Sequence, residues 1–229
     1  YNVVVCDEAG TALTTGDKNV AIGYAALDLE DTGTDSVAIG YNALTAQNND
    51  AANYNVAVGS SAGAAVTTAT SVTLIGAEAG KAINTGSNNV MVGHAAGDAI
   101  TSGNLNVAVG SDSLGANTVG DRSVAIGHQA LLRQNPSTNT DMYNVAVGYN
   151  AGLDITTGTG QTLIGGLAGD AITTGADNTA VGYQALSTNE TSANNTAVGV
   201  SALKLNTGAG NTAVGRGALL NQAAGSNNT

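Results

Sequence analysis

Hydrophobic and polar positions along this chain repeat at an interval of about 17 residues. Each copy centres on four residues such as Val20-Ala21-Ile22-Gly23, in which the positions one and three before the glycine hold Val, Ile or Thr throughout. Side chains two positions apart lie on the same face of a strand, and β-branched residues suit a pleated surface. The pattern therefore predicts one short strand per copy, with the β-branched pair in the interior and the residue between them facing away.

A glycine follows the predicted strand in twelve copies, and Cys6 takes its place in a thirteenth copy at the start of the chain. A glycine at a fixed place indicates a backbone turn that a Cβ atom would obstruct. We expect such turns at Gly23, Gly40, Gly59, Gly76, Gly93, Gly110, Gly127, Gly148, Gly165, Gly182, Gly199 and Gly215. Asn228 and Thr229 open a further copy, so both ends interrupt a repeat. We therefore expect residues 1–229 to form a single array taken from a longer fibre.

Two kinds of copy differ in where they carry a further large aliphatic residue. In one kind, Leu occupies the fourth position after the glycine and a polar residue the seventh, as in Leu27 and Glu30. In the other kind, Gly occupies the fourth position and an aliphatic residue the seventh, as in Gly80 and Ile83. Because protein interiors are close-packed, this exchange predicts a stacked solenoid with one extra aliphatic group per coil.

Three further features complete the predicted coil. The residue four positions before the glycine is Asn in nine copies, which indicates an amide ladder, and we assign the Asn and Ala columns to contacts between chains. The segments 155–158 and 172–175 read Ile-Thr-Thr-Gly and predict a second short strand. Insertions at residues 46–54 and 132–143 are expected to protrude as loops. The fold prediction is an all-β parallel β-roll, a solenoid of about thirteen coils of about 17 residues.

Composition narrows the function classes. The chain has no Trp or Phe, 32 glycines and a formal net charge of −11. Its six Lys and Arg residues form no cluster, which argues against binding nucleic acid or anionic lipid. No apolar run approaches the ~18 residues that span a bilayer, so we expect no membrane insertion. No nucleophile, phosphate-binding or carboxylate-pair motif appears, and we expect neither enzymatic activity nor a cofactor.

The repeat resembles two related families. Residues 36–40 and 123–127 read Ser-Val-Ala-Ile-Gly, as in the YadA-like heads of trimeric autotransporter adhesins. Residues 178–186 read Asn-Thr-Ala-Val-Gly-Tyr-Gln-Ala-Leu, which is similar to a repeat of phage tail fibres. The resemblance covers the whole chain. It implies left-handed parallel β-rolls that associate, side by side or intertwined, as a homotrimer.

Three functions are consistent with these observations. The first is a structural and receptor-binding segment of a trimeric phage tail fibre that mediates host attachment. The second is a trimeric autotransporter adhesin on a bacterial surface, and the third is an ice- or mineral-binding solenoid that uses its Thr-Thr pairs. The first two imply an extracellular location, on the virion or the cell surface. Their partners would be further copies of the chain and a glycan or protein receptor of the host.

The residue directly after the motif glycine is the most variable and supplies the candidate receptor contacts. These are Tyr24, Tyr41, His94, His128, Tyr149 and Tyr183, together with Pro136 and Tyr143 in the longer insertion. The alternative is a turn-edge position at which bulky side chains cover the coil or pack between chains.

Acidic residues gather near the start of the chain. Their oxygen atoms are the ligands that Ca²⁺ prefers, although no established calcium-binding spacing is present. The group comprises Asp28, Glu30, Asp31, Asp35 and Asp50. A solvated acidic face is the other interpretation and the one we favour, so we predict no metal site.

Overall fold

The computed structural model describes residues 1–221 and 224–229. Within them the chain is all-β, with one three-residue strand in each predicted copy. The chain divides into two compact units, Tyr1–Asp112 and Ser113–Thr229. The first unit contains β1 (Val3–Val5), β2 (Val20–Ile22), β3 (Val37–Ile39), β4 (Val56–Val58), β5 (Thr73–Ile75), β6 (Val90–Val92) and β7 (Val107–Val109). The second contains β8 (Val124–Ile126), β9 (Val145–Val147), β10 (Thr162–Ile164), β11 (Thr179–Val181), β12 (Thr196–Val198) and β13 (Thr212–Val214).

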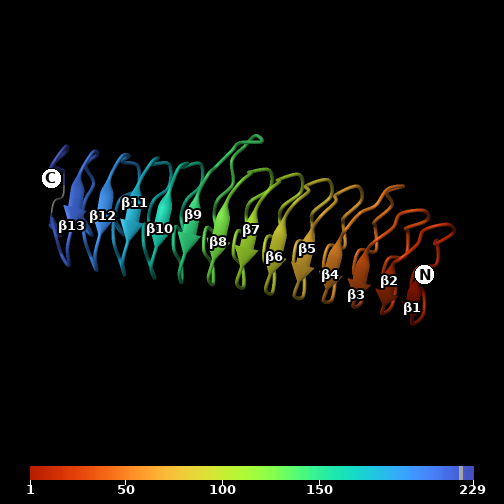
Figure 1. Ribbon diagram of the computed structural model, residues 1–229. Helices are drawn as coiled ribbons and strands as arrows, with labels where there is room; N and C mark the ends of the chain where they lie inside the picture. Colours follow the sequence, from red (N-terminus) through yellow and green to blue (C-terminus); the bar gives the residue numbers. More distant parts are fainter. Residues whose placement is uncertain (222–223) are drawn as a thin grey trace. The chain divides into compact units, whose positions relative to one another are not determined.

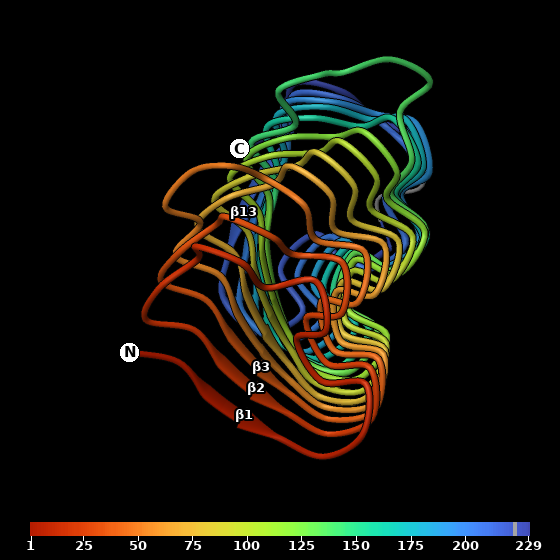
Figure 2. The same ribbon diagram turned by 90° about the vertical axis from the view of Figure 1, so that its right-hand side faces the viewer.

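Within each unit the strands lie side by side in chain order and point the same way (Figure 1). Val20 pairs with Val37, and Thr162 with Thr179, so each strand hydrogen-bonds the strand one copy further on. Figure 2 views the coils end on, and within each unit the coils without an insertion follow the outline of their neighbours. Each unit is therefore a parallel β-solenoid with about 17 residues per turn, as the repeat predicts.

The strands face the opposite way from the prediction. The middle residue is the buried one, as at Ala21 and Ala180, where the exposed fraction is 0%. The β-branched pair on either side is half-buried or exposed. Alternation of residue types along a strand indicates that its two faces differ, but it does not indicate which face is internal. Here the coil interior already holds a column of Leu or Ile side chains, and only a small residue fits beneath most of them.

The motif glycines occupy turns, as predicted. Gly59 has a φ of +142°, and a Cβ atom there would lie 2.4 Å from the carbonyl oxygen of Gly76 in the next coil. Glycine is therefore required both by the backbone conformation and by the close approach of the next coil. Cys6, with φ at +92°, takes this place on the exposed first coil.

The exchange between the two kinds of coil fills the interior. The Leu side chains at the fourth position and the aliphatic ones at the seventh are fully buried in the inner coils, for example Leu44 and Ile83. Three coils, however, bury two large groups, because Leu74, Met91 and Leu163 replace the central Ala of the strand. A Cβ atom on Gly80 would meet Leu74 Cδ2 at 2.7 Å, so these residues fill the space above the fourth-position glycines. The prediction of one extra aliphatic group per coil is therefore wrong for these three coils.

The polar residues at the seventh position also lie inside. They are fully buried at Glu30, Gln47, Asn117, Gln134, Asn189 and Asn206, whereas Gln222 lies outside the described residues. Gln47 Nε2 donates to Glu30 Oε2 at 2.8 Å and to Ser36 Oγ at 3.0 Å. The interior of these coils therefore has an apolar part and a hydrogen-bonded polar part.

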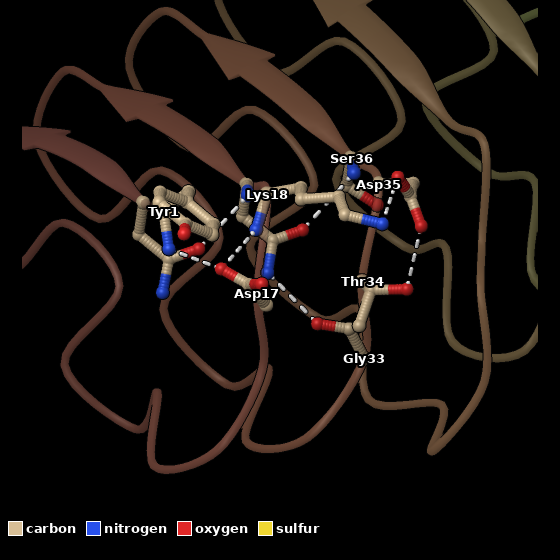
Figure 3. Close-up of polar contacts among 9 residues, drawn as sticks. Tyr1, Asp17, Lys18, Gly33, Thr34, Asp35 and Ser36 are labelled. Atoms are coloured by element: carbon tan, nitrogen blue, oxygen red, sulfur yellow. Dashed lines mark hydrogen bonds and ion pairs between the residues drawn. The ribbon is translucent and has the colours of Figure 1, made fainter.

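The Asn column forms part of the polar interior. Asn19 is fully buried; its Nδ2 donates to the Gly33 carbonyl at 2.8 Å, and its Oδ1 accepts from the Ser36 N–H at 3.0 Å. Figure 3 shows the Gly33 and Ser36 ends of these bonds. The predicted amide ladder is therefore present, but its hydrogen bonds join mainly Asn side chains to backbone groups. Its assignment to contacts between chains was wrong, as was that of the Ala column, since both are buried within one chain.

The remainder of each coil is irregular. The second strands predicted at residues 155–158 and 172–175 do not form. There the Thr156 hydroxyl donates to the Thr173 carbonyl at 3.2 Å, and the Thr173 hydroxyl to the Glu190 carbonyl at 2.9 Å. Thr side chains thus connect coils where strand pairing was expected.

Candidate functional site

The outward residues of the strands form a surface that we call the β-branched face. It consists of the first and third residues of β1–β7 in the first unit and of β8–β13 in the second. All of these residues are Val, Ile or Thr, and none is charged. Ile75 and Ile164 are each 42% exposed. Each unit therefore presents an uncharged, mainly apolar surface on a chain with a net charge of −11.

The residues directly after the motif glycines form an exposed column in each unit. In the first unit the rings of Tyr24 and Tyr41 stack, with centroids 5.6 Å apart and planes at 13°. A hydrogen bond to the Glu8 carboxylate, together with its negative charge, raises the pKa of the Tyr24 hydroxyl. His94 is exposed further along this column, between coils that carry Ala77 and Ser111. The structure therefore brings two of the predicted contact residues together and leaves the third apart.

In the second unit the column begins with another stack. The rings of His128 and Tyr149 have centroids 5.6 Å apart and planes at 10°. Gly166 follows Tyr149 in the column, and Tyr183 comes next. Tyr149 and Tyr183 are 58% and 52% exposed. The aromatic column is thus interrupted by a single residue without a side chain.

The insertion at residues 132–143 protrudes only in part. Pro136 and Met142 are buried, whereas residues 137–139 and Asp141 are exposed. Figure 1 shows this green loop between β8 and β9 extending past the other loops of its unit. Pro136 is therefore unsuited to the receptor contact predicted for it, because its ring packs beside Gly120, where a Cβ atom would lie 3.1 Å from Pro136 Cγ.

The base of this loop is held by a polar cluster. Tyr143 is 58% exposed, and its hydroxyl donates to Asp141 Oδ2 at 3.1 Å. Arg122 forms an ion pair with Asp141 and lies over the Tyr143 ring, 5.8 Å from its centroid. The charge of Asp141, followed by Tyr143, raises the pKa of Arg122. Sequence reasoning singled out Tyr143 but not the two charged residues beside it.

The acidic residues considered for calcium point in different directions. Glu30 is inside the coil, where it accepts hydrogen bonds from the Gly33 N–H and from Gln47. Asp28 accepts from the Thr11 hydroxyl and Asp50 from the Thr32 hydroxyl. Throughout residues 1–221 and 224–229, no three His, Cys, Asp or Glu side chains are grouped to hold a metal ion.

Two acidic residues outside the predicted sites have unusual surroundings. Burial, with smaller contributions from Asp112 and Glu78, raises the pKa of Asp98. Burial likewise raises the pKa of Asp170, and the negative charge of Asp154 adds to the effect. Asp170 Oδ1 accepts no hydrogen bond from the described residues. The sequence does not predict the raised pKa values at these two positions, because nothing in the local sequence distinguishes them from other acidic residues of the chain.

The described part of the chain encloses no pocket and contains no helix that could cross a membrane. No family model matches the sequence, and no curated protein or solved structure is similar to it at a significant level. Within the described residues, the side chains that a binding partner could contact therefore lie on the outer surfaces of the coils.

Proposed function

We propose that this chain is a structural and receptor-binding segment of a homotrimeric fibre, located outside the cell. The β-branched face carries the proposal. It is unpaired in the single chain, has no charged residue, and continues through every coil of each unit. Extended contiguous apolar surfaces on soluble proteins mark interaction sites.

A further copy of the same chain is the partner that best fits this face. Its coils have the same spacing, so outward side chains of two copies can interlock coil by coil along a unit. Charge also favours this arrangement, because two copies with a net charge of −11 each can approach through an uncharged surface without opposing carboxylates. The first unit contributes two outward residues from each of its seven strands. That is a substantial part of the roughly 20–30 residues that one partner supplies to a standard interface.

The mass of the protein in solution tests the assembly. Analytical ultracentrifugation is expected to give three times the chain mass of 22.2 kDa. Replacing Val92 and Val109 together with Lys places two charges on the β-branched face of the first unit and should yield a folded monomer. Ser111→Lys, which adds a charge beside this face, is the matched control and should stay trimeric. A well-folded wild-type monomer at micromolar concentration would contradict the proposal.

Attachment to a host receptor is assigned to the exposed column of aromatic residues and to the loop at 132–143. A phage tail fibre is the first candidate and a bacterial adhesin the second, and the same architecture serves both. Weak contacts repeated on three chains would reinforce one another. Labelled trimer should bind susceptible cells, and protein with residues 137–140 replaced by Gly and Ser should bind them less well. Equal binding by the two proteins would show that the loop is not part of the receptor-binding site.

The third candidate, an ice- or mineral-binding solenoid, receives no support from the Thr-Thr pairs. The hydroxyls of Thr67, Thr156 and Thr173, each the first residue of a pair, donate to carbonyl groups of the next coil. These hydroxyls stabilise the stack of coils, so only the second Thr of each of these pairs is exposed to water. We therefore do not carry this candidate further.

A further inference from the structure

The β-branched face of each unit is bordered on both sides by a column of residues. One border is the exposed column after the motif glycines, which we call the trailing edge. The other consists of the residues two places before each strand, such as Lys18 before β2 and Arg122 before β8, which we call the leading edge. Lys18 and Arg122 are both exposed. A partner that covers the face therefore also meets the side chains of its two edges.

Two neighbouring coils of the first unit carry a charged pair on the leading edge. Lys18 Nζ lies 3.9 Å from Asp35 Oδ1 of the next coil, and Figure 3 shows both residues. The same two coils carry the stacked rings of Tyr24 and Tyr41 on the trailing edge. An ion pair thus borders one side of the face where a ring stack borders the other.

The second unit has the same arrangement with different residues. Arg122 forms an ion pair with Asp141 and lies over the ring of Tyr143, which is the leading-edge residue of the next coil. The same two coils carry the stacked rings of His128 and Tyr149 on the trailing edge. In each unit, the ring stack therefore begins in the coil whose leading edge carries a cation.

Contacts within one chain do not account for this match. Lys18 and Arg122 are the only Lys or Arg residues of the leading edge, and each belongs to the coil in which a ring stack begins. Lys18 and Tyr24 are six residues apart, and the extended strand β2 between them separates them by about 15–20 Å. Exposed ion pairs also add little to the stability of a single chain. The match between the two edges therefore needs a partner to explain it.

The symmetry of a parallel trimer brings the two edges together. Three copies related by a three-fold axis along a unit place identical coils at the same height, with their β-branched faces turned toward the axis. The contact between neighbours is then heterologous, so the leading edge of each face meets the trailing edge of the next. A cation of one chain therefore reaches the ring stack that begins in the same coil of its neighbour.

The chemistry of the two edges is complementary. The face of an aromatic ring attracts the cation of Lys or Arg, and a tyrosine hydroxyl can donate to a carboxylate beside that cation. Tyr and Arg are also enriched among the residues that contribute most to protein–protein binding. An edge that carries an ion pair therefore suits an edge that carries a ring stack.

We propose that in the trimer the leading edge of each chain contacts the trailing edge of the next copy. In the first unit Lys18 meets the stack of Tyr24 and Tyr41, and in the second unit Arg122 meets the stack that begins at His128. This inference rests on the proposed homotrimer and names the residues that set its register. The β-branched face supplies apolar burial, and the cation–ring contacts determine which coils of neighbouring chains lie side by side.

Cysteine cross-linking in the full chain tests the arrangement. In a Cys6→Ser background, Arg122→Cys with His128→Cys should give a covalent trimer on a denaturing gel without reductant. One chain cannot close this bridge, because the Cα atoms of a disulfide lie within about 7 Å of each other. Lys18→Cys with Tyr24→Cys applies the same test to the first unit, and it decides the question if the second-unit variant folds poorly.

Arg122→Cys with Val200→Cys is the matched control. These positions lie on opposite edges but four coils apart, at β8 and β12, so they should give no covalent trimer. Covalent dimers as the end product of Arg122→Cys with His128→Cys would show two-fold pairing and overturn the proposal. The mass in solution separates the two claims: a trimer that forms no cross-link contradicts the edge contacts alone, and a monomer contradicts the trimer itself.

A double-mutant cycle tests whether the cation and the stack contact each other. Lys18→Gln and Tyr24→Leu should each raise the dissociation constant of the trimer about tenfold or more, since each trimer holds three such contacts. The combined variant should be no weaker than the weaker single variant. Lys81→Gln, which removes an exposed lysine paired with Glu78 away from the face, should leave the dissociation constant unchanged. Effects of the two changes that simply add would show that these side chains do not interact, and would overturn the contact.

Discussion

Single residues repeat in columns, so the same physical requirement is met many times. The motif glycine is the most restricted of them, because its φ lies in a region that other residues rarely adopt and its Cα faces the next coil at short range. This requirement was predictable from the sequence, since a residue type kept in twelve copies at one place indicates a backbone that needs it. The close approach of the next coil could not be predicted in the same way.

Gly76→Ala should lower the melting temperature markedly. The new Cβ would lie 2.4 Å from the Gly93 carbonyl oxygen in a backbone with φ at +131°. Strain and overpacking together should cost about 3 kcal/mol or more. Gly166→Ala is the control, because its Cβ meets only ordinary contacts, and its melting curve should match the wild type. Thermal unfolding followed by circular dichroism measures both, and equal curves would show that the coils can separate to admit a methyl group.

Asn55→Ala should also destabilise the protein. Asn55 Nδ2 donates to Gln47 Oε1 and to the Ala69 carbonyl, each at 2.8 Å, and its Oδ1 accepts from the Val72 N–H at 3.1 Å. Removing the amide leaves these buried partners unpaired, at a cost of roughly 2–4 kcal/mol. The same change at exposed Asn139 should alter the unfolding free energy by no more than about 0.5 kcal/mol. Urea denaturation distinguishes the two, and similar midpoints would contradict the role of the ladder.

At the scale of the element, a three-residue strand gives too little information to fix its orientation. The sequence predicts where β2 or β11 lies, because alternating β-branched residues precede a glycine. It does not tell which face is internal, since Val and Ile are as common in interiors as Ala is. The deciding fact is the narrow interior of the coil, where Leu27 in the coil of β2 and Leu186 in the coil of β11 already occupy the space. That fact depends on how the coil closes, which no local pattern contains.

The loop at 132–143 is an element with a buried base and an exposed tip. We expect that deleting residues 137–140 leaves the melting temperature nearly unchanged, whereas Met142→Ala costs about 2–5 kcal/mol because Met142 is fully buried. Deleting the whole insertion would remove Gln134, Pro136 and Met142 from the interior and should prevent that coil from folding. Limited proteolysis of the variants checks this division, and a stable protein without the whole insertion would contradict it.

At the scale of the whole molecule, acidic charge makes stability depend on pH. The raised pKa values of Asp98 and Asp170 mean that the folded state holds their protons more tightly than the unfolded state. The stability that these groups contribute is therefore fully present below the unfolded value of about 3.9 and is lost as the pH rises through the folded values. Asp170→Asn should raise the melting temperature at pH 7 relative to the wild type; this gain should shrink as the pH falls through the folded pKa of Asp170 and vanish below the unfolded value of about 3.9. If the gain in melting temperature stayed constant with pH, ionisation of Asp170 could not be its cause.

The whole-molecule architecture was the most predictable property, and the surface sites were the least. Thirteen strands at an interval of about 17 residues lead to stacked coils in each unit, because similar coils bury one another's surfaces. The candidate site depends on finer facts. His128 and Tyr149 were predicted as separate contacts, but the stacking of their rings follows only from the way neighbouring coils align.

The ladder that joins the coils also has a genetic consequence. Asn19, in a Leu-type coil, and Asn144, in a Gly-type coil, each offer an oxygen to the backbone N–H of the corresponding residue 17 positions later. A coil of either kind therefore meets its neighbour through the same donors and acceptors, and removing one whole coil leaves no group of the ladder unmatched. Near-identical repeats in a gene recombine unequally, and such events would add or delete whole coils. The copy number of a protein of this design can thus evolve in single steps, while its loops diverge independently.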